Sequence, residues 1–100
     1  MHAAGRMLFL AGLLFWPAIP QAAEPPRIVR VCASCHGLDG VGQNVDIPNI
    51  AGQSGIYLKN QLRAFRNGQR RHPQMTISAE QLTDREIDQI VTHYALMPAR

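Results

Sequence analysis

The stretch Cys32-Ala33-Ser34-Cys35-His36 places two cysteines three positions apart and follows them at once with a histidine. On a helix, residues three apart project from the same face, so both thiols can reach one flat ligand. Cys-x-x-Cys-His is typical of c-type haem attachment, in which each thiol bonds one vinyl group. His36 can bring a neutral imidazole nitrogen to the iron. The motif therefore predicts one covalent haem c, bound by Cys32 and Cys35, with His36 as an axial ligand.

Three other uses of the cysteine pair are open from the motif alone. A redox dithiol of the thioredoxin type lies near a βαβ pattern, and no convincing strand pattern appears in this chain. A zinc site needs about four ligands, and the chain has no second cysteine pair. A structural disulfide would leave His36 unexplained. Haem attachment accounts for all three side chains, so we favour it.

Residues 1–23 have the layout of a secretory signal peptide. A basic start that includes Arg6 precedes an almost wholly apolar run over residues 7–19. That run is about thirteen residues, whereas a membrane-spanning helix needs about twenty. We predict cleavage after Ala22 or Ala23, no stable membrane insertion afterwards and a periplasmic location, where c-type haem is attached in bacteria. An uncleaved N-terminal anchor is the alternative.

Residues 24–100 then form one small domain with a limited core, which a covalent haem would stabilise. The formal net charge is +3, and it falls to +2 when Arg6 leaves with the leader. The two haem propionates would offset most of that charge, so no nucleic-acid role is predicted. A basic cluster either steers a redox partner or forms a solvated helix face. It comprises Lys59, Arg63, Arg66, Arg70 and Arg71.

Hydrophobic spacing predicts an all-α fold with three main helices. The first opens at Pro25-Pro26 and ends at Gly37. The second runs from an N-cap at Ser54 to Asn67, before Gly68. The apolar stripe of the first helix is predicted to comprise Ile28, Val31, Cys32 and Cys35.

The segment after the second helix is predicted to be loop over residues 70–75, because Pro73 interrupts it, with at most a short helical turn at residues 78–81. A capping-box pattern from Thr83 to Glu86 starts the last helix. His93 lies off the apolar face of that helix, so we expect it at the solvated surface.

Met75 is the candidate for the second axial ligand of the iron. It lies 39 residues after His36, enough chain to travel around a haem and return on the other face. Two other methionines leave with the leader, and Met97 lies at the end of the last helix. His72 is the rival, and it would give a bis-histidine haem.

The apolar island Ile47-Pro48-Asn49-Ile50 allows two interpretations. It can simply pack as a loop against the core. Alternatively, the Pro48 carbonyl accepts a hydrogen bond from the second ring nitrogen of His36, which would fix the ring and raise its basicity.

Taken in order, these motifs resemble the class I c-type cytochromes of the single-haem cytochrome c5, c553 and cytochrome c4-like group. The resemblance implies an all-α fold wrapped around one haem, with crossing terminal helices. It also implies His36 and Met75 as ligands and the Pro48 carbonyl behind His36. The helix before Cys32 is short, so the resemblance does not predict how Tyr94 packs. The matching residues are Cys32 to Gly37, Gly40, Gly42, Ile47 to Gln53, Tyr57-Leu58, Gln61-Leu62, Phe65, Gly68, Arg71, Pro73 to Met75 and the helix from Leu82 to Tyr94.

The predicted function is periplasmic electron transfer by a small carrier that is not an enzyme. His/Met ligation leaves no open position on the iron for a substrate. Electrons would pass to redox proteins in weak, transient encounters. The main alternative is a haem subunit tightly bound to a periplasmic dehydrogenase or oxidase. A catalytic haem is a third option, and it would need a free iron position.

Overall fold

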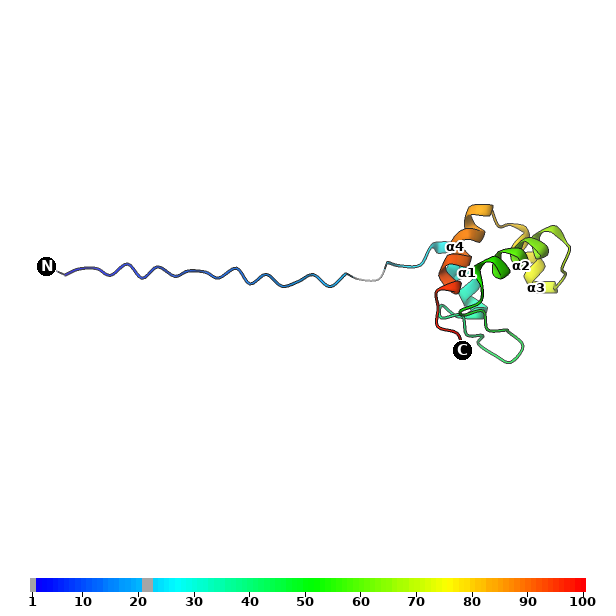
Figure 1. The fold of residues 1–100 in the computed structure, drawn as a ribbon, viewed down its shortest axis with the longest axis horizontal. Coiled ribbons are helices and arrows are strands. Elements are labelled where there is room, and N and C mark those ends of the chain that lie inside the picture. The colour runs from blue at the N-terminus through cyan, green and yellow to red at the C-terminus, as the bar shows by residue number, and fades with distance from the viewer. Residues whose placement is uncertain (1, 21–22) are drawn as a thin grey trace.

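The computed structural model describes residues 2–20 and 23–100, and it contains four helices (Figure 1). They are α1 (Arg27–His36), α2 (Gly55–Asn67), α3 (Pro73–Glu80) and α4 (Asp84–Ala95). The all-α prediction is confirmed, and α2 begins and ends where the sequence predicts. Side-chain capping by Ser54 and a left-handed Gly68 fix those two ends.

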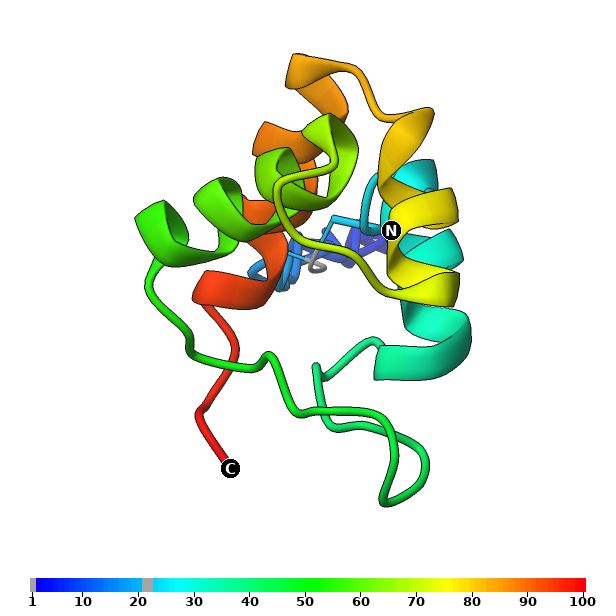
Figure 2. The same ribbon diagram turned by 90° about the vertical axis from the view of Figure 1, so that its right-hand side faces the viewer.

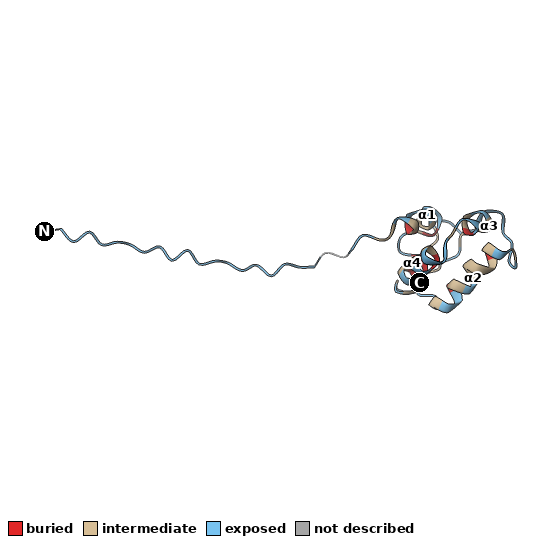
Figure 3. Ribbon diagram, turned by 90° about the horizontal axis from the view of Figure 1, so that it is seen from above, coloured by how far each residue is buried: buried red, intermediate tan, exposed pale blue. Residues whose placement is uncertain are grey.

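Residues 2–20 contain no helix and are exposed along their length (Figure 3). In the part of the chain that the structure describes, no helix is both long and apolar enough to cross a membrane. Of the two predicted cleavage positions, the one after Ala22 lies outside the described residues, so the structure does not bear on it.

Helix α3 corrects the prediction of a loop over residues 70–75. Pro73 begins the helix because its fixed φ suits the first helical position. The side chain of His72 caps the helix by accepting from the backbone N–H groups of Gln74 and Met75, both at 3.2 Å. Histidine is outside the usual set of N-cap residues, so propensity does not predict a cap at this position. Met75 therefore lies in the first turn of a helix and not in a loop.

Helix α1 also differs in detail from its prediction. Pro26 is the N-cap and Arg27 the first helical residue, while Gly37 ends the helix as expected with φ of 75°. The apolar stripe is rotated by about one residue. Val29 is fully buried, whereas Val31 is 62% exposed.

The core lies where α1 and α2 pack against α4, and α3 packs against α2. In Figure 3, α1 and α3 lie on the same side of α2, and the loop that follows α1 runs along the lower end of the domain in Figures 1 and 2. The buried core cluster comprises Val29, Leu58, Ile87, Ile90, Val91 and Tyr94.

Two ion pairs join α2 to α4. Lys59 lies 2.8 Å from Asp88, and Arg66 lies 2.8 Å from Asp84. The neighbouring Arg66 guanidinium lowers the pKa of the Asp84 carboxyl. Two members of the basic cluster are therefore neutralised by α4.

The start of α4 is a capping box, as predicted. Thr83 Oγ1 accepts from the Glu86 N–H, and Glu86 accepts from the Thr83 N–H, each at 3.1 Å. We predict that Thr83→Ala lowers the free energy of unfolding by about 1 kcal/mol, because one helix N–H loses its acceptor. Denaturant unfolding measures this change. Thr92→Ala, at an exposed position on the same helix, is the control, and equal effects of the two variants would contradict the prediction.

Candidate haem site

All four helices and the loop after α1 surround one cavity of about 560 Å³. This volume falls within the range of roughly 300–1,000 Å³ that is usual for cofactor pockets. Apolar side chains dominate the lining, as expected for a site that takes a flat apolar ring. The helix residues that line it are Cys32, Cys35, His36, Tyr57, Leu58, Gln61, Leu62, Phe65, Gln74, Met75, Ile90 and Tyr94.

His36 is buried at the end of α1 and lines the cavity. Its Nδ1 lies 2.9 Å from the carbonyl oxygen of Pro48. A carbonyl only accepts hydrogen bonds, so Nδ1 carries a proton, and in the neutral ring Nε2 then keeps its lone pair. This tautomer is the one that coordinates a metal through Nε2.

Cys32 and Cys35 line the same cavity, and both are free thiols. Burial raises the pKa of the Cys32 thiol to about 11. The reactive thiol of a redox dithiol has a lowered pKa, so this environment does not suit that alternative. Within residues 2–20 and 23–100, no three side chains of His, Cys, Asp or Glu gather as a zinc site requires.

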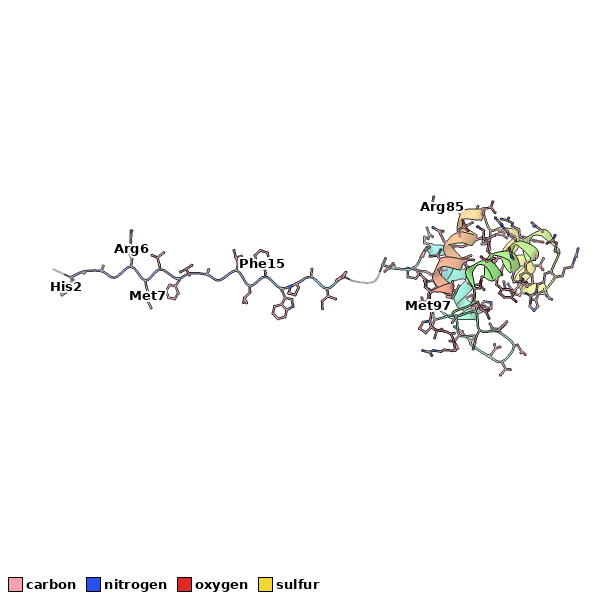
Figure 4. All side chains as sticks on the ribbon, in the orientation of Figure 1. His2, Arg6, Met7, Phe15, Arg85 and Met97 are labelled. Atoms are coloured by element: carbon pink, nitrogen blue, oxygen red, sulfur yellow. The ribbon has the colours of Figure 1, made fainter. Side chains whose placement is uncertain are left out.

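Met75 projects from the first turn of α3 and lines the cavity. Figure 4 places Met7 on the extended N-terminal segment and Met97 just beyond α4. Of the methionines that the structure describes, only Met75 contributes to the lining.

His72 also lines the cavity, and its ring is engaged at the start of α3. Its Nδ1 accepts two backbone N–H bonds, so Nδ1 holds the lone pair and Nε2 carries the proton. Coordination through Nε2 would require the proton to move to Nδ1 and the α3 cap to break. His36 and His72 thus hold opposite tautomers.

The loop that carries Pro48 is folded tightly onto the turn after α1. The Gly42 N–H donates to Asn49 Oδ1 at 2.8 Å, and the Gly40 carbonyl accepts from Ile50 at 2.8 Å. The Gly42 Cα is so close to the Ile47 carbonyl that a Cβ would collide with it. These contacts hold Pro48 at a fixed place beside His36.

Two residues of α4 have roles that the sequence did not reveal. The expectation of a solvated His93 is wrong: it is partly buried and its Nε2 lies 2.7 Å from the Leu38 carbonyl. Tyr94 is fully buried, and its hydroxyl donates to the Gly37 carbonyl at 2.9 Å. Burial raises the pKa of Tyr94 above its usual value. Both contacts join residues more than fifty positions apart, so no local sequence signal marks them.

The family described as Cytochrome c matches residues 23–94 of this chain. The match covers the cavity lining from Cys32 to Tyr94. The chain belongs to the cytochrome c family. The resemblance to class I c-type cytochromes of the c4, c5 and c553 kind is confirmed.

Relatives of this cytochrome c come from several bacteria. Cytochrome c-554(548) of Halomonas halodenitrificans is 39% identical over 78 residues, which cover 75% of this chain and 94% of the relative. The thiosulfate dehydrogenase electron acceptor of Thiomonas intermedia is 34% identical over 85 residues. The solved thiosulfate dehydrogenase of Marichromatium purpuratum, in its as-isolated form, aligns with a TM-score of 0.63, 38% identity and 67% coverage of this chain. This cytochrome c spans 39% of the electron acceptor and 14% of the solved chain.

Family membership gives this cytochrome c a covalent haem c and a role in electron transfer with redox partners. The family is Cytochrome c and several relatives are named as cytochromes, so this cytochrome c is an electron carrier and not an enzyme. The dithiol and zinc interpretations of the cysteine pair are therefore set aside.

We predict that Gly42→Ala destabilises this cytochrome c by about 1–3 kcal/mol, because the added methyl group forces the loop at Ile47 outward. Denaturant unfolding of the haem-containing protein measures the loss. Gly55→Ala is the control, since its Cβ would lie 3.3 Å from the nearest side-chain atom, Val91 Cγ1. A Gly42→Ala protein as stable as the control would show that the loop has room to move.

Proposed function

We propose that this cytochrome c carries one electron in the periplasm on a haem bound through thioether bonds to Cys32 and Cys35 and ligated by His36 and Met75. One observation carries the ligand assignment. His36 Nε2 keeps a free lone pair beside the cavity, and Met75 lines the same cavity. The Nδ1 atom of His72, by contrast, accepts backbone N–H groups at the start of α3. The haem supplies the one-electron couple.

The side chains around the cavity influence the reduction potential of the haem. The Pro48 carbonyl holds the imidazole of His36 and raises its basicity. Apolar lining residues keep water away from the iron and favour the reduced form. Arg70 and Arg71 are the arginines at the cavity, and they are suited to offset the two propionate charges.

We also propose that residues 1–23 are the signal peptide and residues 24–100 the cytochrome domain. The apolar run of the leader is too short to span a membrane comfortably, and the family match begins at residue 23. Export places the cysteine pair where haem is attached.

We predict that Met75→Ala abolishes the weak far-red absorption band that a methionine–iron bond gives to an oxidised haem. The variant leaves one iron position open, so the reduced protein binds carbon monoxide while the wild type does not. Absorption spectra with and without carbon monoxide measure both effects.

His72→Ala is the matched control, because it removes the rival side chain and leaves Met75 in place. We expect it to keep the far-red band and to lower stability by about 1 kcal/mol through loss of the α3 cap. A band that survives Met75→Ala, or that disappears only in His72→Ala, would refute the ligand assignment.

A second prediction concerns the leader. Expression of the full chain with haem-maturation machinery should give a periplasmic, haem-containing protein whose N-terminus follows Ala22 or Ala23. Mass spectrometry of the purified protein identifies the cleavage position. A chain that lacks residues 1–23 should remain in the cytoplasm without haem. An intact leader on the mature protein would instead support the N-terminal anchor.

A tightly bound haem subunit is the second candidate function. It is favoured by the similarity to thiosulfate dehydrogenase electron acceptors and to part of a solved thiosulfate dehydrogenase. Size-exclusion chromatography of the periplasmic fraction distinguishes the two. A free carrier elutes as a small monomer, whereas a subunit elutes in a larger complex together with its dehydrogenase.

A further inference from the structure

Helix α4 presents two neighbouring side chains to the turn that directly follows His36. His93 Nε2 lies 2.7 Å from the Leu38 carbonyl, and the Tyr94 hydroxyl donates to the Gly37 carbonyl at 2.9 Å. Two consecutive carbonyls of the turn are thus bound by two consecutive residues of one helix. The two rings meet edge to face, with centroids 4.8 Å apart.

The bond to Leu38 defines the state of the His93 ring. A carbonyl accepts and never donates, so Nε2 of His93 carries a proton. Because this nitrogen is a donor in both the neutral and the charged imidazole, the contact does not depend on which of the two is present. Leu38 itself is 52% exposed, so the bond ties down a stretch of backbone that apolar burial does not hold.

Backbone hydrogen bonds continue from this turn to the loop of Pro48. The Gly40 carbonyl accepts from the Ile50 N–H at 2.8 Å. The Gly52 N–H donates to the Tyr94 carbonyl at 3.0 Å. The segment that follows Pro48 is therefore attached both to the turn and to α4 itself.

We propose that His93 is a positioning residue of the haem site. Together with Tyr94 it holds the turn at Gly37 and Leu38 against α4. Through that turn it keeps the Pro48 carbonyl in contact with Nδ1 of His36. The inference rests on the proposed role of His36 as an iron ligand.

The consequence for the haem follows from the basicity of the imidazole. The hydrogen bond to Pro48 makes His36 a stronger donor to the iron, which favours the oxidised form. A looser turn weakens this bond and favours the reduced form. His93 thus influences the reduction potential, although it is not among the side chains that line the cavity.

The test uses His93→Ala in the haem-containing protein and three measurements by nuclear magnetic resonance and electrochemistry. The first is exchange of the His36 Nδ1 proton with solvent, and the second is exchange of the Ile50 and Gly52 amides. The third is the reduction potential. We expect proton exchange at all three sites to become about tenfold faster, because one restraining hydrogen bond is lost. We also expect the reduction potential to rise.

Three further variants separate positioning from general stability. His93→Gln keeps an N–H donor and is expected to restore exchange to within about twofold of the wild type. Thr92→Ala, exposed on the same helix, should change nothing. Tyr94→Phe removes only the hydroxyl bond to Gly37 and should accelerate the same three protons, which provides the test if His93→Ala does not fold.

Two results would overturn the inference. One is unchanged exchange and potential in His93→Ala. The other is equal acceleration at these sites and at the amides of α2, which would mean that His93 only stabilises the whole fold. Failure of the underlying ligand assignment is seen separately, because the oxidised wild type would then lack a His36 ring resonance shifted by the iron. The Ile50 and Gly52 amides still decide the positioning role in that case.

Discussion

The hydrogen bond between Nδ1 of His36 and the carbonyl of Pro48 is the interaction on which the site depends. It selects the imidazole tautomer, and it sets the orientation of the ring at the end of α1. For the bond to form, the loop after α1 must return to the helix it has just left. The glycines at positions 40 and 42 permit that return, because the backbone passes too close to Ala51 and Ile47 to admit a side chain.

The two histidines at the cavity show how the same type of side chain can have two different roles. His36 donates a hydrogen bond from Nδ1 to a carbonyl and keeps the other ring nitrogen free for a metal. His72 accepts two backbone N–H groups and thereby begins α3. Its role is to place Met75 in the first helical turn. The two rings are thus distinguished by the atoms to which Nδ1 is hydrogen-bonded.

Much of the architecture could be predicted because its signals are local. Ser54 and Gly68 delimit α2, and the box from Thr83 to Glu86 begins α4, since each depends on residues within one helical turn. The cysteine pair and His36 lie in five consecutive positions, so the cofactor could be predicted in the same way.

The features that sequence reasoning missed depend on contacts between distant residues or on unusual caps. Helix α3 begins with a histidine cap, which propensity does not favour. The inner face of α1 is rotated towards Val29, because packing against α4 decides it. Helical spacing predicts a solvated His93, because its partner at Leu38 is 55 positions away in the sequence.

The pairing of Lys59 and Arg66 with carboxylates of α4 has a consequence for diffusion. Their charges cancel locally, whereas Arg70 and Arg71 at the cavity have no ion-pair partner among the described residues. The haem propionates would offset those two charges as well, so each of these four cations would be balanced by a nearby anion. The field of such close pairs falls off quickly with distance. Encounters with a partner would therefore be guided little by these four side chains.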